Sequence, residues 1–181
     1  MRSGSLDHVV PCWGYCYTTK ETVPTKIAVF GDTCESSYFC LYHVICSHMK
    51  DLVKGCDILF HELSYGPCLL DISRDVLNSP EYQDKQLTER LLADDSNVAK
   101  WQKIEALAQK WKHSTAEMVG KYATEVEAKR VVLIHIGSRY EVKNRDKASR
   151  IEGMLRKRVK EYYNGFVILA YDGLEVFLNE Q

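Results

Sequence analysis

The sequence predicts an α/β fold in which short buried strands alternate with amphipathic helices. Two observations support this prediction. Short apolar runs, such as residues 26–30 and 130–136, have the length and composition of buried strands. Between such runs, apolar residues recur every three or four positions, as they do on the buried face of a helix. This alternation is typical of a layered fold.

The first half of the chain contains three predicted strands and one predicted helix. The strands span residues 13–19, 26–30 and 57–60. Between the second and the third strand, apolar side chains at helical spacing predict a helix that Gly55 is placed to end. These side chains are Leu41, Ile45, Met49 and Leu52.

The second half continues the alternation. Helices are predicted over residues 98–111, 114–126 and 148–159, and strands over 130–136, 167–171 and 174–178. Ser114 and Glu117 have the spacing of a capping box, in which Ser114 caps the helix and Glu117 reaches back to it. The last two strands are joined at Asp172 and Gly173, so we expect the fold to end in an antiparallel tail.

Residues 66–97 are the least organised part of the sequence and predict an insertion. They contain Pro67 and Pro80, show little periodicity, and are longer than the structureless loops usual in compact domains. Seven acidic and three basic residues give the segment a net charge of -4, which is unsuited to contact with phosphate. We expect a single partial domain over residues 1–181 that carries this insertion.

The charge balance gives no general attraction to RNA. The net charge of the 181 residues is -1, so any nucleic-acid contact must come from a local patch or a metal site. Residues 141–161 contain eight basic and four acidic residues, a net charge of +4. This stretch offers a surface for an RNA backbone, but a charge-rich helix is more often a solvated face, and we favour that interpretation.

The seven cysteines indicate reduced thiols. Their number is odd and several lie inside apolar runs, which argues against a disulfide framework. No Cys-x-x-Cys pair occurs, so a thiolate zinc cluster is not expected. We therefore expect an intracellular, reducing compartment: cytoplasm, nucleus or mitochondrial matrix. No run approaches the ~20 apolar residues of a membrane span, and we expect no membrane association.

Polar residues that can bind a metal or move a proton follow three of the predicted strands. They are Asp32, the pair His61 and Glu62, and His135. Polar groups presented at strand ends by a rigid sheet are where functional sites usually form. Taken singly, Asp32 is more often part of an ordinary turn, and His61 or His135 is more often a satisfied histidine near the edge of the core. Only their conjunction indicates a site.

His113 stands just before a predicted helix. Amide groups and the helix dipole make such a position attractive to phosphate, and Ser114 and Thr115 offer further hydrogen-bond donors. A histidine beside a bound phosphate can protonate a leaving oxygen, a step typically worth ~10²–10⁴-fold in rate. The alternative is that His113, Ser114 and Thr115 form an ordinary helix cap.

Taken in order, these segments resemble ribonuclease Z, a zinc-dependent endonuclease family of the metallo-β-lactamase superfamily that trims the 3′ end of precursor tRNA. The segments that carry the resemblance are Gly31-Asp32-Thr33, His61-Glu62, His113-Ser114-Thr115-Ala116, His135 with Ser138-Arg139-Tyr140, and Asp172-Gly173. The resemblance covers nearly the whole chain and implies the carboxy-terminal half of an αββα sandwich.

The resemblance also implies roles for these residues. Asp32 would bridge two zinc ions, and His135 would bind the second zinc. His113 would contact the scissile phosphate and assist the leaving oxygen, with His61 and Glu62 orienting this network. Ser138, Arg139 and Tyr140 would position the RNA, and Ser114 and Thr115 would contact the substrate. The implied reaction hydrolyses precursor tRNA after its discriminator base and leaves a 3′-hydroxyl, which suits two close metal ions.

The main metal motif of the family, His-x-His-x-Asp-His, is absent from this sequence. Asp32 and His135 give two ligands, whereas a catalytic zinc usually has three from the protein. We therefore expect weak zinc binding and no activity without a missing amino-terminal half or a second chain that supplies it. A half-sandwich also exposes a sheet face and an edge, so a homodimer is a further expectation.

Three alternatives stay open. The chain could belong to another phosphodiesterase of the metallo-β-lactamase fold, or it could be a non-catalytic structural or RNA-docking half-domain. Alternating strands and helices also suggest a doubly wound nucleotide-binding domain, but the sequence contains no Gly-x-Gly-x-x-Gly or phosphate-binding loop in support.

Overall fold

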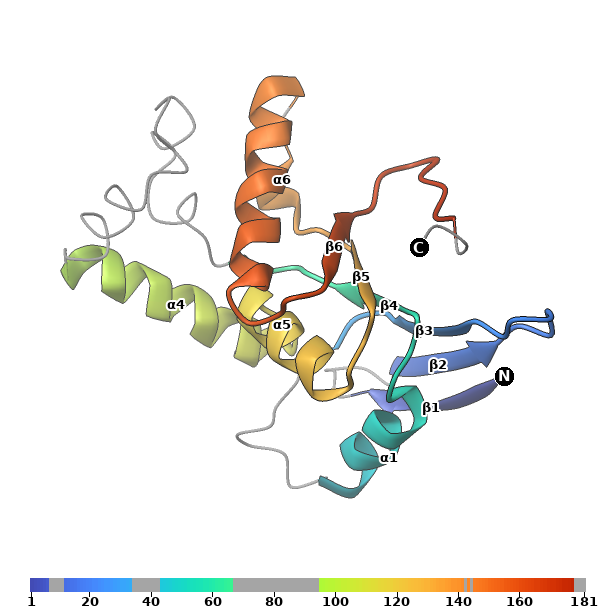
Figure 1. Cartoon of the computed structure of the whole chain (residues 1–181). Coiled ribbons are helices and arrows are strands. Elements are labelled where there is room, and N and C mark those ends of the chain that lie inside the picture. The colour runs from blue at the N-terminus through green and yellow to red at the C-terminus, as the bar shows by residue number, and fades with distance from the viewer. Residues whose placement is uncertain (7–11, 34–42, 67–94, 142, 144, 178–181) are drawn as a thin grey trace.

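A computed structural model describes residues 1–6, 12–33, 43–66, 95–141, 143 and 145–177, and Figure 1 shows its elements. Within these residues, one six-stranded sheet has the order β1-β2-β3-β4-β5-β6. The strands are β1 (Arg2–Leu6), β2 (Cys12–Thr18), β3 (Lys26–Phe30), β4 (Ile58–Glu62), β5 (Arg130–Ile134) and β6 (Phe166–Leu169). The helices are α1 (His43–Val53), α4 (Asp95–Trp111), α5 (Ala116–Glu125) and α6 (Arg145–Lys160), with a 3-10 turn η2 (Ser138–Tyr140).

The sheet is parallel from β3 to β6 and antiparallel from β1 to β3. The antiparallel part is therefore at the amino-terminal end, and the prediction of an antiparallel tail was wrong. Residues 174–177 do not form a strand. Helix α6 returns the chain so that β6 pairs parallel with β5, and the carbonyl of Phe177 accepts a hydrogen bond from the Arg130 guanidinium instead of joining a ladder.

Strand β1 was not predicted from the sequence, because it lacks an apolar alternation. Its burial depends on a tertiary contact: Gly4 lies against Met49 of α1, where a larger side chain would clash. Gly14 of β2 lies against the same methionine. The close approach of α1 to β1 and β2 therefore requires small residues in both strands.

One face of the sheet forms the hydrophobic core. The strand register aligns buried residues across five strands. They are Cys16, Ala28, Leu59, Val131 and Val167. Apolar residues of α1, α5 and α6, among them Val53, Val119 and Leu155, belong to the same core cluster. Figure 1 shows α4 extending away from the sheet. Among the described helices, none combines the length and apolar character that a membrane span requires.

The start of α5 differs from the predicted capping box by one residue. Thr115, not Ser114, is the N-cap, and its hydroxyl accepts a hydrogen bond from the Met118 amide. Glu117 does not reach back along the chain. It bonds Arg158 and Tyr162, and so links α5 to α6. Burial opposes ionisation of Glu117, but the hydrogen bonds and charges of its partners leave its pKa lowered.

Both ends of the predicted insertion at 66–97 fall on described residues. Gly66 is buried and belongs to the framework, because its amide donates to the Tyr140 hydroxyl and its carbonyl accepts from the Ala116 amide. Residues 95–97 already belong to α4. Residues 67–94 lie outside the described part of the chain.

Among the described cysteines, Cys12, Cys16 and Cys56 are free thiols. Cys16 and Cys56 are buried, and burial raises the pKa of the Cys56 thiol to about 11. This agrees with the prediction of reduced, buried thiols at these two positions. The remaining four cysteines have no described side chain.

Candidate metal centre

The candidate site lies at the carboxyl ends of the parallel strands. Asp32 follows β3, Glu62 is the last residue of β4, and His135 directly follows β5. His113 comes from the link between α4 and α5, which lies beside the residues after β4: Tyr65 and Thr115 form a bridge. The parallel sheet therefore gathers side chains that are far apart in the sequence.

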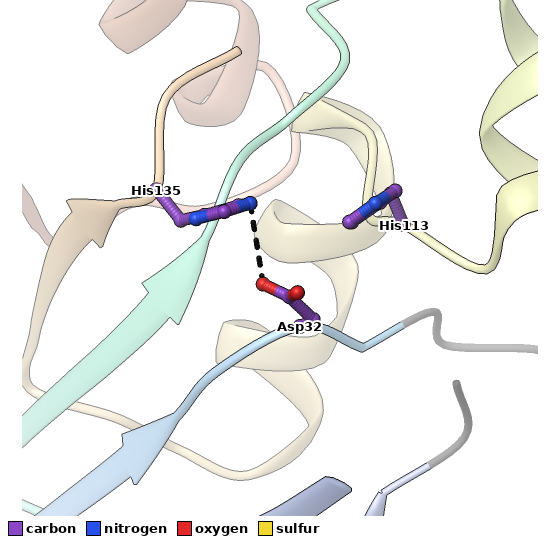
Figure 2. A group of neighbouring side chains, drawn as sticks. All are labelled: Asp32, His113 and His135. Carbon is purple, nitrogen blue, oxygen red and sulfur yellow. Dashed lines mark ion pairs between the residues drawn. The ribbon is translucent and has the colours of Figure 1, made fainter. Parts of the chain in front are cut away.

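Asp32, His113 and His135 converge. One ligand atom from each lies within 4.8 Å of the other two. Nε2 of His135 is 3.2 Å from Oδ1 of Asp32, and the two imidazole rings are stacked with centroids 5.8 Å apart. Figure 2 shows the three side chains pointing toward one another from separate segments. Two imidazoles and a carboxylate are ligands that suit zinc, so this donor set fits the metal that the sequence predicts.

The site is open on one side. The side chains of His135 and Asp32 are 55% and 35% exposed, whereas that of His113 is 19% exposed. Three donors are fewer than a pair of metal ions needs. The exposed side leaves room for further ligands from outside the described residues.

Behind His113 lies Glu62, whose side chain is fully buried. Its Oε1 accepts from the amides of Ser114 (2.6 Å) and Thr33 (3.3 Å), and its Oε2 accepts from the amide (2.9 Å) and hydroxyl (2.7 Å) of Ser64. A buried carboxylate is costly unless such donors surround it. These bonds tie the ends of β3 and β4 to the start of α5.

Glu62 also orients His113. Nδ1 of His113 lies 3.3 Å from Glu62 Oε1 and 3.3 Å from the Ser64 hydroxyl. Because Glu62 acts as an acceptor in its other contacts, we assign the Nδ1 proton to the bond with Glu62. Nε2 is then the nitrogen that would meet a metal or a substrate. A carboxylate behind a histidine is the usual support for a metal-binding or proton-transferring imidazole.

The position of His113 is set by the end of α4. Lys112 has φ of 53°, its amide donates to the Gln109 carbonyl (3.2 Å), and the His113 amide donates to the Ala108 carbonyl (2.9 Å). This pair of bonds is a Schellman motif, which reverses the chain after a helix. The motif brings His113 back over the start of α5.

The backbone at His135 is unusual. Its φ is 50°, in the left-handed region that a histidine seldom occupies. Two residues later, Gly137 approaches the carbonyl of Ser64 so closely that any side chain would clash. Strained backbone that persists at a strand end is often part of a functional site. Here it accompanies the turn that points His135 toward Asp32.

His61 does not face this site. Its ring packs between Phe30 and Tyr122, with ring centroids 5.6 and 5.7 Å away. Its Nδ1 lies 2.9 Å from the Glu62 carbonyl, and burial lowers its pKa. Successive residues of a strand point to opposite faces, so His61 and Glu62 diverge. The prediction that His61 helps to orient the site is therefore corrected: it is a core histidine.

Three of the predicted substrate contacts are also framework residues. Ser114 and Thr115 are buried, and the Ser114 hydroxyl donates to the Thr33 carbonyl at 2.6 Å. Tyr140 is buried with its hydroxyl bonded to Gly66. These groups shape the site and do not face solvent. Ser138 is exposed, and the side chain of Arg139 lies outside the described part of the structure.

Ser64 was missed by sequence reasoning. Its hydroxyl contacts Glu62 and His113 and lies 3.4 Å from the His135 carbonyl, so it joins the residues that hold the site. The one available signal was a hydroxyl residue two positions after a strand-end glutamate. That signal is too common to identify a site residue.

No family model and no curated protein matches the sequence. Several solved structures resemble the chain, among them the following two. The metallo-β-lactamase fold protein YhfI from Bacillus subtilis aligns with a TM-score of 0.54 and 15% identity, over 95% of this chain and 46% of that one. Human tRNase Z, short form, aligns with a TM-score of 0.53 and 18% identity, over 98% of this chain and 42% of that one.

Identities this low show the fold and not the activity. Independently of these comparisons, the converging Asp32, His113 and His135 form a group that could hold a metal ion. The chain has the metallo-β-lactamase fold. It spans less than half the length of each of these two structures.

Proposed function

We propose that this chain is the carboxy-terminal half of a metal-dependent phosphodiesterase that removes the 3′ trailer of precursor tRNA. The observation that carries the proposal is the convergence of Asp32, His113 and His135, with the buried Glu62 behind His113. The likeness to human tRNase Z and the sequence motifs support tRNA as the substrate class.

Asp32 and His135 would hold the metal, for which we propose zinc. Nε2 of His135 lies 3.2 Å from Oδ1 of Asp32, and both side chains are exposed enough for another segment to place further metal ligands beside them. A zinc ion bound there would stabilise negative charge on the phosphate oxygens. The ligands missing from this set are proposed to come from an amino-terminal half that carries His-x-His-x-Asp-His.

His113 is proposed to move the proton that the leaving oxygen needs. Glu62 holds Nδ1, so Nε2 can present a proton to an oxygen in the site. Glu62 also stabilises the imidazolium form through which such a transfer passes. His113 lies close enough to Asp32 and His135 to serve as a metal ligand instead, and the zinc content of a variant distinguishes these roles.

Ser138 and Arg139 are proposed to position the RNA, since they follow His135 on the turn that borders the site. The basic stretch 141–161 contributes less than its charge suggests. Arg158 bonds Glu117 and Glu161, and Arg156 pairs with Glu152. The Arg156 pair is exposed, as on a solvated helix face, whereas the Arg158 side chain is only 16% exposed and links α6 to α5.

Reconstitution tests the proposed function. The chain would be joined to an amino-terminal half that carries His-x-His-x-Asp-His and assayed with zinc on precursor tRNA and on a cyclic nucleotide. We expect tRNA cleavage that Asp32→Ala abolishes. Cleavage of the cyclic nucleotide alone would instead indicate another phosphodiesterase. A zinc-free, inactive complex would favour the second candidate function, a non-catalytic half-domain. The small number of metal ligands on the described residues also favours that candidate.

A further inference from the structure

We infer that Ser64 is a positioning residue for His113: its hydroxyl oxygen accepts the Nδ1 proton of the imidazole and so fixes the tautomer in which Nε2 is the unprotonated nitrogen. Nδ1 of His113 lies 3.3 Å from the Ser64 oxygen and 3.3 Å from Oε1 of Glu62. The tautomer follows from contacts within this chain. Its consequence for turnover rests on the proposed function, in which His113 delivers a proton.

The single proton of the Ser64 hydroxyl is committed to Glu62. The Ser64 oxygen lies 2.7 Å from Glu62 Oε2, closer than it lies to the His135 carbonyl at 3.4 Å or to Nδ1 of His113 at 3.3 Å. A hydrogen bond to a carboxylate is also stronger than one to a neutral acceptor, because it is charge-assisted. Since a hydroxyl has one proton to donate, the Ser64 oxygen acts toward His113 as an acceptor. Nδ1 must then carry the proton.

Glu62 has little capacity left for His113. Its Oε1 accepts from the amides of Ser114 at 2.6 Å and Thr33 at 3.3 Å. A carboxylate oxygen offers about two lone-pair sites, and these two amides fill them. The Nδ1 proton of His113 is therefore shared between Oε1 and the Ser64 oxygen. The hydroxyl supplies the acceptor site that the carboxylate lacks.

The framework fixes the position of the Ser64 hydroxyl. Ser64 is 7% exposed, and its amide donates to Oε2 of Glu62 at 2.9 Å. The carbonyl of Ser64 packs against Gly137, and the amide of the preceding Leu63 donates to the Ile134 carbonyl at 2.9 Å. A hydroxyl with a fixed position and a committed proton is suited to orient an imidazole, as the groups behind metal-binding histidines do.

The tautomer decides which nitrogen of His113 can act in the site. With Nδ1 protonated and bonded to Ser64 and Glu62, the lone pair of the neutral ring is on Nε2. In the proposed reaction the imidazolium loses its Nε2 proton to the leaving oxygen, the electron pair of that bond stays on Nε2, and Nδ1 keeps its own proton. In the other tautomer the lone pair would be on Nδ1, directed at two acceptors. Loss of the Ser64 hydroxyl should therefore impair proton delivery.

The test is nuclear magnetic resonance of the full chain, kept zinc-free with a chelator at about pH 8, where histidine is ordinarily neutral. Long-range proton–nitrogen correlation distinguishes protonated from unprotonated ring nitrogens, and His113→Gln identifies the signals of His113 by their loss. We expect a single tautomer, with the proton on Nδ1, in the original chain. In Ser64→Ala the two nitrogen signals of His113 should move toward each other, because the tautomers then exchange.

Controls separate the tautomer from folding. Ser64→Cys retains the size of the side chain, but its thiol is a weak donor and acceptor, so it serves if Ser64→Ala loses its cooperative thermal transition. Ser149→Ala removes an exposed hydroxyl on α6 and should leave the His113 signals unchanged. The inference is overturned if His113 of the original chain carries its proton on Nε2. It is also overturned if a folded variant without the Ser64 hydroxyl gives the ring signals of the original chain.

Turnover of the chain joined to an amino-terminal half is the second readout. Ser64→Ala should lower kcat roughly 10–100-fold while KM and zinc content stay unchanged, as expected for loss of an orienting group. An unchanged kcat would show that Ser64 does not position the proton donor. Because the tautomer is measured without metal and without RNA, the expected tautomer in a chain that cleaves no tRNA when joined would refute the proposed function alone.

Discussion

The carboxylate of Glu62 and the imidazole of His113 form one unit, with Oε1 of Glu62 3.3 Å from Nδ1 of His113. Glu62 is fully buried, and its other contacts are with amides and a hydroxyl from three segments of the chain. The same carboxylate thus holds the framework together and sets the direction of the histidine. Substitution of Glu62 should therefore affect both stability and chemistry.

Glu62→Gln should lower the free energy of unfolding by about 1–3 kcal/mol. The amide NH₂ of glutamine would replace one carboxylate oxygen, and the buried donors that bonded to that oxygen would lose their acceptor. Urea denaturation of the isolated chain measures this effect. Glu175→Gln, at an exposed position, is the matched control and should have no measurable effect. Equal stability of the original chain and the Glu62 variant would show that the buried bonds contribute little.

His113→Ala and Asp32→Ala should separate proton transfer from metal binding in the reconstituted protein. His113→Ala should lower turnover by roughly 10²–10⁴-fold with unchanged zinc content, as expected for loss of a general acid. Asp32→Ala should lose zinc as well as activity. Metal analysis and turnover are measured on the same preparations. If both variants lose zinc equally, His113 is a ligand and its proposed role is wrong.

His61 should make stability depend on pH. Burial lowers its pKa below the ordinary value of 6.5, so below that pH the unfolded chain binds more protons than the folded chain. The contribution of neutral His61 is then complete above about pH 6.5 and is lost as the pH falls. We expect the urea midpoint to drop from pH 7.5 to 5.5. The drop should be smaller in His61→Phe, which retains an aromatic ring between Phe30 and Tyr122. An identical drop in both proteins would assign the effect to other groups.

Gly137→Ala should destabilise the chain by about 1–3 kcal/mol, because the added methyl group would clash with the backbone carbonyl of Ser64. Gly31→Ala is the control, since nothing lies within 4 Å of the added atom. Thermal unfolding compares the two. If Gly137→Ala unfolds like the control, the turn after His135 can shift without cost.

Much of the core was predictable because it depends on local patterns. The apolar run at 26–30 matches β3, and the helical spacing around Met49 and Leu155 matches α1 and α6. Strand β1 was missed because Gly4 is buried by contact with α1, a property of the packing and not of its own neighbours. The carboxy-terminal strands were wrongly predicted to be antiparallel, because the parallel pairing of β6 with β5 depends on how α6 crosses the sheet.

The site was predictable in part for the same reason. Asp32, His113 and His135 stand out as polar groups at the ends of elements, and the structure brings them together. His61 and Ser114 have the same sequence signal but point into the framework, because adjacent residues of a strand or a turn diverge. The contribution of Ser64 depends on how three segments meet, which no spacing within the sequence indicates.

The last prediction concerns the chain alone, which should bind zinc weakly and cleave no tRNA. Asp32, His113 and His135 offer at most three donors, and the side chains of Asp32 and His135 are 35% and 55% exposed. Four-ligand structural zinc sites bind with ~10–16 kcal/mol, and affinity falls as ligands are removed. Competition with a chromogenic chelator should therefore show weak binding, further reduced by His135→Ala. Robust cleavage by the isolated chain, after chelation and return of zinc, would show that it completes the metal site from residues not identified here. The matched comparison is the chain joined to an amino-terminal half that carries His-x-His-x-Asp-His. This joined protein should retain zinc through purification, because the amino-terminal half completes the set of metal ligands.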